Sequence, residues 1–482
     1  MSDHRRNDRN QPGRSAAERT RVQPSRKVAL DVISAVRESD AYANLLLPGR
    51  IARAGLSPAD AALATELTYG TLRMQGYYDR VIARAAGRTV DKIDPPLLDV
   101  LRLGAHQLLS TRVASHAAVN ESVALARQVG SRSGTGFVNG VLREIGRSTP
   151  EEWRVRVLAD AKNDDERFAA LSSHPAWIVR AFHRALESEG RGDELEALLE
   201  ADNTAPRVNL VALPGLAEPP EGARPDRFSP VGFTAGGGDP QGLVTGAEGR
   251  LRVQDEGSQL AALALTRARP IQQGERWLDL CAGPGGKAAL LAAEALAGGA
   301  TLVANEVVPA RAELVRRALA AVPLDVPVWE RDGVGIGAEE PEAFDRILLD
   351  APCTGLGALR RRPEARWRKT PRDVAELTAL QTQLLDSAVA ALKPGGLLAY
   401  ITCSPHVAET RAIVADALDR HRALRPVGTA DIVQSVAEER LDLAGDADLV
   451  QLWPHRHLTD AMFIAVLEKA GGDASAPEAS EQ

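Results

Sequence analysis

The chain has 482 residues, of which 44% are hydrophobic and 26% charged, with a formal net charge of −7. These values predict a soluble globular protein of about three domains with a sizeable core. No apolar run approaches the roughly 18 residues that a membrane helix needs, and the amino terminus lacks the apolar segment of a signal peptide, so we expect a cytoplasmic protein.

Cysteine is rare in this sequence. The only three are Cys281, Cys353 and Cys403, and none lies in a CxxC pair. An odd number without such spacing argues against a disulfide framework and against a structural zinc site, so no metal is expected. Reduced thiols fit an intracellular enzyme.

Positive charge is concentrated in two segments of an otherwise acidic chain. Residues 1–27 contain seven Arg and one Lys against three acidic residues, and residues 360–372 contain six Arg and one Lys against Glu364. We interpret residues 1–24 as a disordered basic tail. The second segment follows directly on Cys353, which favours a loop that contacts phosphate groups.

Residues 25–150 show an almost entirely helical pattern. In LSPAD, Ser57 is a plausible N-cap, Pro58 a first helical residue and Asp60 an acid in the first turn; Asp94 and Pro95 repeat the arrangement. The expected helices are 26–38, 41–54, 58–86, one from 95 through LLDVLRLGAHQLL, 115–129 and 135–147. Together they predict an all-α bundle.

The rest of the chain changes from helices to alternating strands and helices. Residues 151–250 begin with helical segments and continue into a Pro- and Gly-rich part, which predicts linker helices and a small α/β subdomain. From 251 to 470 strands alternate with helices, the pattern of a doubly wound, Rossmann-like α/β sheet with parallel strands. Residues 471–482 read as a second disordered tail.

Two of the cysteines follow predicted strands of this sheet. The apolar run in FDRILLDAPCTG ends at Asp350, with Cys353 in the turn behind it, and the run LLAYI ends just before Cys403. In open α/β sheets the ligand site lies beyond the carboxyl ends of the strands, so both thiols should face one crevice. A single cysteine at a strand end is more often a small buried hydrophobic residue, but two in matching contexts favour a site.

A glycine-rich turn follows an earlier strand and opens a helix. It comprises Cys281, Ala282, Gly283, Pro284, Gly285, Gly286 and Lys287. The spacing fits neither a GxxxxGK[ST] phosphate loop nor a GxGxxG dinucleotide motif. The next strand ends at Glu306, placed to accept ribose hydroxyls, and the one after it leads to Asp332, which could reach an adenine amino group. Three such signals in succession predict a nucleoside cofactor.

Several segments resemble known families. ANLLL, ELTYGTLR, AVNESVALA and FVNGVLREI in residues 43–145 look like the NusB-type RNA-binding helical domain. DLCAGPGGK, DAPCTGLG and ITCS, preceded by VQDEGSQLAALAL, resemble the RsmB/Sun (Fmu) family of ribosomal RNA cytosine-5 methyltransferases. The resemblance covers residues 25–470. It departs from the family at HLTDAMF, where Leu458 and Ala461 replace glycines, and at Gly283, where alanine is commoner.

The resemblance implies an activity and assigns the site. S-adenosylmethionine would be the cofactor, bound by residues 281–287, Glu306, Asp332 and Asp350. Cys403 would attack carbon 6 of a cytosine, Cys353 would assist product release, and Asp350 would also take part in catalysis. The predicted partner is ribosomal RNA of the small subunit (16S), bound by a monomer, with residues 25–150 as RNA-binding domain and residues 251–470 as methyltransferase domain.

Two other functions remain open from the sequence. One is an RNA-binding, antitermination-like module that retains a vestigial cofactor fold. The other is a DNA cytosine methyltransferase, in which the cysteine of the Pro-Cys dipeptide, Cys353, would attack. In a methyltransferase of either kind, acting on RNA or on DNA, nearby positive charge should activate the attacking thiol. Lys287 and the arginines of residues 360–372 are the candidates for that charge.

Overall fold

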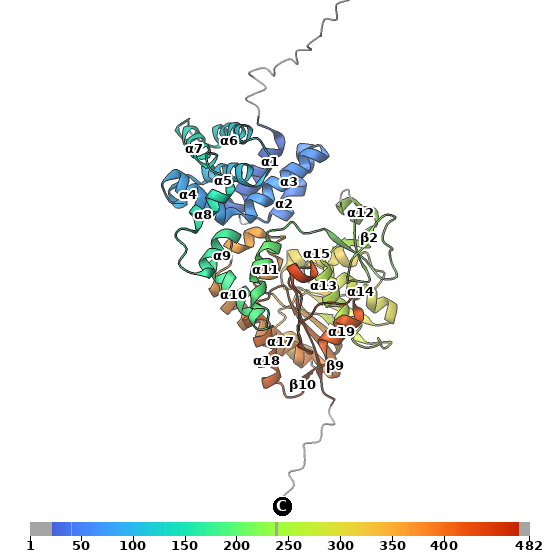
Figure 1. The fold of residues 1–482 in the computed structure, drawn as a ribbon. Helices are drawn as coiled ribbons and strands as arrows, with labels where there is room; N and C mark the ends of the chain where they lie inside the picture. Colours follow the sequence, from blue (N-terminus) through green and yellow to red (C-terminus); the bar gives the residue numbers. More distant parts are fainter. Residues whose placement is uncertain (1–21, 40, 131, 237–239, 472–482) are drawn as a thin grey trace, which may run out of the picture. The chain divides into compact units, whose positions relative to one another are not determined.

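The computed structural model describes residues 22–39, 41–130, 132–236 and 240–471, which form two compact units (Figure 1). The N-terminal unit extends to His174 and includes Arg362–Glu364; the C-terminal unit comprises Pro175–Arg361 and the chain from Ala365 onward. The two predicted tails lie almost entirely outside the described residues. No helix in the described chain has the length and apolar character needed to cross a membrane.

The N-terminal unit is the predicted all-α bundle. Its helices are α1 Pro24–Glu38, α2 Ala43–Ala54, α3 Pro58–Arg73, α4 Gln75–Ala86, α5 Pro95–Ser110, α6 Ser115–Val129, α7 Arg132–Ile145, α8 Pro150–Leu158 and α9 Asp164–Ser172. Helix α5 contacts α1, α3, α4, α6 and α7 and is buried around most of its circumference. Its apolar residues therefore form the centre of one continuous core.

Two details of the predicted bundle are wrong. The segment 58–86 forms two helices that meet at Met74, and the Gly76 N–H donates to the Ser173 hydroxyl at 2.9 Å instead of continuing the helix. A tertiary contact thus overrides a continuous helical pattern. Ser57 caps α3 as predicted, by accepting from the Asp60 N–H, whereas the Asp94 side chain makes no capping hydrogen bond to α5.

The C-terminal unit begins with helices and a small antiparallel sheet. The helices are α10 Ala176–Glu187 and α11 Leu195–Asp202, and α12 Pro240–Gly246 follows within the sheet segment. The strands are β1 Asn209–Ala212, β2 Arg224–Pro225, β3 Gly232–Thr234 and β4 Leu251–Val253, in the order β2-β3-β1-β4. This sheet has its own small core.

The larger sheet positions the candidate site. Its strands are β5 Arg276–Asp279, β6 Thr301–Asn305, β7 Val328–Trp329, β8 Phe344–Asp350, β9 Leu392–Thr402, β10 Leu424–Pro426, β11 Val450–Gln451 and β12 Phe463–Lys469. The order is β10-β12-β9-β8-β5-β6-β7, with β11 paired to β12. Strands β9, β8, β5, β6 and β7 are parallel, as predicted, but β12 runs antiparallel to β9.

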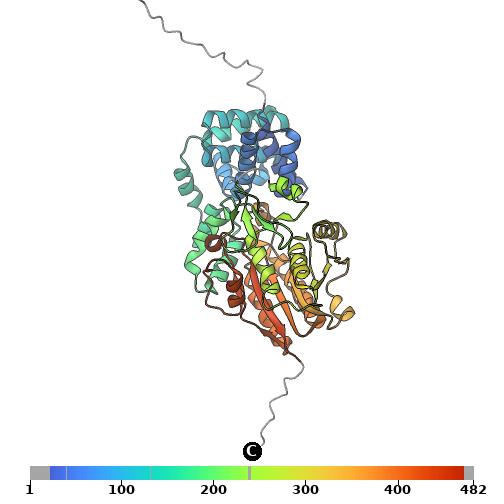
Figure 2. The same ribbon diagram turned by 90° about the vertical axis from the view of Figure 1, so that its right-hand side faces the viewer.

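Helices cover both faces of this sheet (Figures 1 and 2). One layer contains α13 Glu256–Thr266, α14 Gly286–Gly298, α15 Pro309–Leu319 and α19 Thr429–Val436; the other contains α16 Ile336–Glu339, α17 Pro371–Ala391 and α18 Arg411–Arg420. The short helix α20 Pro454–His457 lies in the connection between β11 and β12. Strands buried on both faces need near-continuous apolar runs, and the central strands have them.

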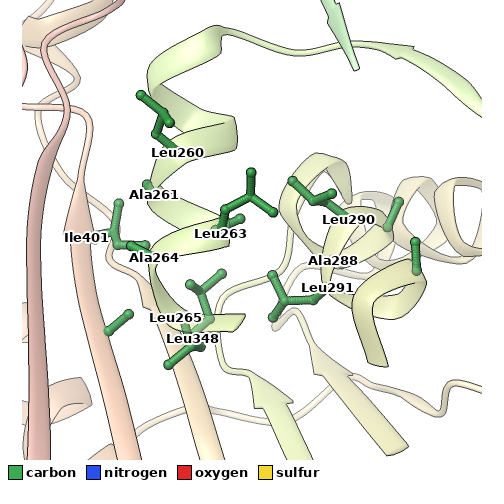
Figure 3. Packing of buried hydrophobic residues seen from close by; sticks show 14 of the residues in the cluster. Leu260, Ala261, Leu263, Ala264, Leu265, Ala288, Leu290, Leu291, Leu348 and Ile401 are labelled. Carbon is green, nitrogen blue, oxygen red and sulfur yellow. The ribbon is translucent and has the colours of Figure 1, made fainter. Parts of the chain in front are cut away.

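The packing of the first helix layer is tight. Figure 3 shows Ala264 of α13 beside Ile401 of β9 and Leu265 beside Leu348 of β8, while Leu263 turns toward α14. Along β8, Leu348 contributes to this core and its neighbours to the core on the opposite face, as the alternation of a strand requires. The rigid strand ends that result support the residues of the site.

Candidate active site

The two strand-end cysteines lie next to each other. Strands β8 and β9 are parallel neighbours, with Asp350 opposite Ile401, so the loops that follow them leave the same edge of the sheet. The Sγ atoms of Cys353 and Cys403 are 3.5 Å apart, and both side chains are partly buried thiols that form no disulfide within the described residues. The structure thus brings together the two thiols that the sequence analysis expects to face one crevice.

A partly buried ion pair lies beside the thiols. Lys287, in the first turn of α14, places its Nζ 2.8 Å from Oδ2 of Asp350 at the end of β8. Burial alone would lower the pKa of Lys287, but the charge of Asp350, its hydrogen bond and the electrostatic effect of Cys403 outweigh burial and raise it. Lys287 therefore remains a cation next to the sulfur atoms.

The Cys353 thiol is held in its protonated form. Its hydrogen bond with Cys403, its burial and the negative charges of Cys403, Glu409 and Asp350 all raise its pKa well above the usual range. The two sulfurs are therefore electrostatically unequal, because Cys353 has carboxylates near it while the Lys287 cation interacts with Cys403.

The glycine-rich turn and Glu306 are brought together at the next strand. Glu306 accepts hydrogen bonds from the N–H groups of Gly283, at 3.1 Å, and Val308, at 3.0 Å. Arg311 pairs with the same carboxylate at 3.3 Å and donates to the Gly283 carbonyl at 2.7 Å. A Cβ atom at position 283 would lie 2.2 Å from Oε2 of Glu306, so the glycine at this position is what allows the close approach.

Other residues of the turn shape the start of α14. Gly285 has φ +103, and a Cβ there would lie 2.5 Å from Cβ of Ala318, so only glycine fits this turn. Its N–H donates to the Ala282 carbonyl at 2.7 Å, which tightens the turn. Burial and the charges of Asp279 and Asp350 raise the pKa of Cys281 far above its usual value. Cys281 thus remains a thiol.

Asp332 lies on the same edge of the sheet but is exposed, three residues beyond the two-residue strand β7. Its carboxylate accepts from the Val334 N–H at 3.1 Å. Buried Asn305 holds this edge together: its amide nitrogen donates to the carbonyls of Leu280 and Arg331, each at 3.1 Å, and its oxygen accepts from the Arg331 N–H. Asn305 thereby joins the loops after β5, β6 and β7.

Sequence reasoning missed a buried acid at the base of the site. Asp279, the last residue of β5, is fully buried, and burial followed by the charge of Asp350 raises its pKa to about 8, against the opposing effects of Lys287 and the Cys281 backbone. An acid that ends an apolar strand directly before a glycine-rich turn was the available signal. Asp279 is therefore largely protonated at neutral pH.

A second missed residue is Glu409, in the turn Val407–Glu409 after the Cys403 loop. Its carboxylate is completely buried and accepts from Thr354, which follows Cys353, and from Ser404, which follows Cys403. The sequence offered only an acid six residues after the cysteine, a weak signal that nothing local connects to Thr354.

Three arginines of the segment 360–372, which the sequence predicts to contact phosphate groups, make contacts inside the protein instead. Arg360 pairs with Asp460 at 2.8 Å and with Asp255 at 3.1 Å, and Arg361 pairs with the same two carboxylates at 3.0 and 2.7 Å. Arg366 is buried and donates to residues at the end of α11. The prediction is wrong for these three, because their guanidinium groups are used for internal contacts.

The segment that departs from the family pattern is part of the same framework. Leu458 adopts φ +58, a conformation that favours glycine, and is exposed. Ala461 is buried, and its N–H donates to the Gly357 carbonyl at 2.9 Å. Ala461 thus supports the loop that carries Cys353. Burial is the largest cause that lowers the pKa of His455 and of His457 to about 4, so both imidazoles are neutral.

Comparison with known proteins decides the family. Residues 267–468 match the model of the 16S rRNA methyltransferase RsmB/F family, and residues 23–147 match the NusB family. A ribosomal RNA small subunit methyltransferase B of Enterobacter sp. (strain 638) is 33% identical over 82% of this chain and 90% of its own length. The chain belongs to the RsmB/F methyltransferase family. The predicted family and the NusB-like helical domain are thereby confirmed.

Other relatives agree with this membership. A methyltransferase of Mycobacterium tuberculosis (strain H37Rv) is 48% identical over 93% of this chain and 97% of its own. The crystal structure of PH0851 matches the fold with a TM-score of 0.76 at 23% identity, over 93% of this chain and 99% of that one. The predicted fold class is confirmed: a helical domain is followed in the chain by a Rossmann-like methyltransferase domain. In this RsmB/F chain the paired cysteines therefore lie in a methyltransferase domain.

Proposed function

We propose that this RsmB/F methyltransferase transfers a methyl group from S-adenosylmethionine to carbon 5 of a cytosine in small-subunit (16S) ribosomal RNA. The observation that carries the proposal is the pair of adjacent thiols, 3.5 Å apart, in the loops that follow neighbouring parallel strands. One thiol next to the base can explain covalent attack. The second needs a separate role, and product release supplies one.

The chemistry requires a covalent step because carbon 5 of cytosine is a weak nucleophile. Addition of the Cys403 thiolate to carbon 6 makes carbon 5 electron-rich enough to bond to the methyl carbon, as the bond between that carbon and the donor sulfur breaks. A base then takes the carbon 5 proton, and the electron pair of that C–H bond expels the Cys403 sulfur from carbon 6, which restores the aromatic ring and the thiolate. We assign Cys353 to this release step.

The residues around the glycine-rich turn fit the proposed cofactor. Bound S-adenosylmethionine supplies an activated methyl group, carried with ribose hydroxyls, an adenine amino group and positive charge. The site offers carboxylates at successive strand ends, Glu306, Asp332 and Asp350, and residues 281–287 bring backbone close to Glu306 because Gly283 has no Cβ. Glu306 would receive the ribose hydroxyls and Asp332 the adenine amino group, with Asp350 near the thiols.

The RNA substrate follows from the family and from the helical domain. The residues that match the NusB family precede the methyltransferase domain in the chain, and we assign them the task of holding RNA. The target base must leave its stack to reach a thiol beyond the strand ends, as in other enzymes that modify bases. Residues 25–150 are proposed as the RNA-binding domain and residues 251–470 as the catalytic domain.

Alanine substitution of each cysteine tests the proposal. Cys403→Ala should abolish transfer of labelled methyl groups to ribosomal RNA, and Cys353→Ala should accumulate a covalent protein–RNA adduct that survives denaturing electrophoresis. Cys281→Ala, the third thiol, is the control and should form no such adduct. Wild-type turnover in Cys403→Ala would refute the assigned roles.

Two further experiments separate this proposal from the two alternative functions. An adduct with 5-fluorocytosine that is lost in Cys353→Ala and retained in Cys403→Ala would identify Cys353 as the nucleophile, the arrangement expected of a DNA cytosine methyltransferase. Calorimetry that detects no S-adenosylmethionine binding by the full chain would favour an RNA-binding module with a vestigial cofactor fold.

A further inference from the structure

The two cysteine loops converge on one buried carboxylate, that of Glu409. Its Oε1 accepts from the Thr354 N–H at 2.7 Å, and its Oε2 accepts from the Ser404 hydroxyl at 2.6 Å and from the Thr354 hydroxyl. Thr354 directly follows Cys353, and Ser404 directly follows Cys403. A single side chain thus holds the residues next to both thiols.

Further contacts fix this carboxylate in place. Gln381 of α17 donates to Oε1 at 3.4 Å and to the Pro352 carbonyl at 2.9 Å. The Tyr400 hydroxyl donates to the Glu409 carbonyl at 2.8 Å. Helix α17, through Gln381, and strand β9, through Tyr400, therefore both hold Glu409, and these contacts fix the position of its carboxylate.

No ion pair compensates the charge of Glu409 among the residues that the structure describes. The titratable groups around it are Cys353, Tyr400 and His406. Cys353 in turn faces Cys403, Glu409 and Asp350, and Lys287 lies on the far side, paired with Asp350. The Lys287 cation thus interacts with Cys403, while the carboxylates of Glu409 and Asp350 act on Cys353.

We propose that Glu409 is a positioning residue that holds the Cys353 loop against the Cys403 loop and places a fixed negative charge behind Cys353. The hydrogen bonds account for the first part. The second part agrees with the raised pKa of Cys353, whose causes, after the hydrogen bond to Cys403 and burial, include the charge of Glu409. The consequence is a division of roles, in which Cys353 stays a thiol while Cys403 is free to attack.

This inference rests on the proposed function, since the division of roles matters only if the two thiols act in turn. It can nevertheless be tested without RNA. Glu409→Gln keeps an oxygen for the Thr354 N–H and an amide group that the Thr354 and Ser404 hydroxyls can accept from after rotating. The substitution therefore removes the charge and preserves the shape of the site.

The experiment measures alkylation of Cys353 by iodoacetamide in the full-length protein, with peptide mass spectrometry to separate the three cysteines. In Glu409→Gln the rate at pH 9 should rise about tenfold, which corresponds to a pKa lower by about one unit. Two controls are matched: Glu294→Gln removes a buried carboxylate paired with Arg267, and Tyr400→Phe removes a tie to the Glu409 backbone and keeps its charge. Both should stay within about twofold of wild type.

Either of two results would overturn the inference. An unchanged alkylation rate in Glu409→Gln would show that its charge does not act on Cys353. An equal acceleration in Tyr400→Phe would show that loosening of the loop, and not charge, controls the thiol. A wild-type protein that transfers no methyl group would refute the proposed function, while the alkylation rates would still decide the role of Glu409.

Discussion

The first two arginines of the basic segment 360–372, Arg360 and Arg361, should stabilise the fold instead of binding RNA. Arg360 has 6% of its side chain exposed and lies between Asp460, at 2.8 Å, and Asp255, at 3.1 Å, whose side chains are 9% and 7% exposed. Arg360→Met keeps much of the apolar stem and leaves two buried carboxylates to share Arg361. Removing one partner of a buried charge cluster typically costs about 3–5 kcal/mol, and the remaining arginine should limit the loss to about 3 kcal/mol.

Urea unfolding followed by circular dichroism measures this free energy of unfolding. The control is Arg372→Met, since the Arg372 side chain is 87% exposed and pairs with Glu376 on the same helix. A loss of stability below detection is expected there. Binding of ribosomal RNA should keep its salt dependence in Arg360→Met. A different result would refute this reasoning. If the free energy of unfolding were unchanged and the slope of log affinity against log salt concentration became smaller in magnitude by about one, Arg360 would be a phosphate contact.

Three further predictions follow from single residues. Leu458→Gly should raise the free energy of unfolding in urea by about 1 kcal/mol, because Leu458 has φ +58 and an exposed side chain. Gly357→Ala should lower methyl transfer about a hundredfold, because a Cβ there would lie 2.1 Å from a backbone oxygen of Ala461 and would displace the Cys353 loop; Gly136→Ala, in open space, is the activity control. For Asp279, whose folded pKa of about 8 exceeds its unfolded value, protonation stabilises the fold at low pH. Its contribution to the free energy of unfolding should fall by about 2–3 kcal/mol between pH 5 and pH 7. Urea titrations at each pH should show that the total fall is smaller by this amount in Asp279→Asn, while the contributions of Asp202 and Asp226 remain.

The sheet and the paired thiols could be predicted because each depends on short-range patterns. An apolar run such as Ile347–Leu349 indicates a buried strand, and strands that are parallel end at one edge. Cys353 and Cys403 follow two such runs, so their meeting required only that β8 and β9 be neighbours. The direction of β12 could not be predicted, since an apolar strand buried on both faces has the same composition whether it runs parallel or antiparallel.

The contacts that tie the loops together could not be predicted, because their partners are distant in the chain. Arg360 reaches Asp255 and Asp460, which are 105 and 100 residues away. A run of arginines has the same appearance in sequence whether its charges face solvent, phosphate or buried carboxylates. In the fold, the buried carboxylates of Asp255 and Asp460 determine what these arginines contact, because a buried carboxylate requires a positive partner. The arginines that pair with them are no longer available to bind RNA.

Glu409 and Lys287 together suggest why this site needs charges of both signs. Once one of two thiols 3.5 Å apart has lost its proton, the two sulfurs share the proton that remains, and a symmetric surrounding would let either sulfur attack. Lys287 on the Asp350 side and the buried Glu409 carboxylate behind the Cys353 loop remove that symmetry. The order of attack and release would then be set by two charges, one in the first turn of α14 and one in the turn Val407–Glu409, and exchanging their signs should exchange the roles of the two sulfurs.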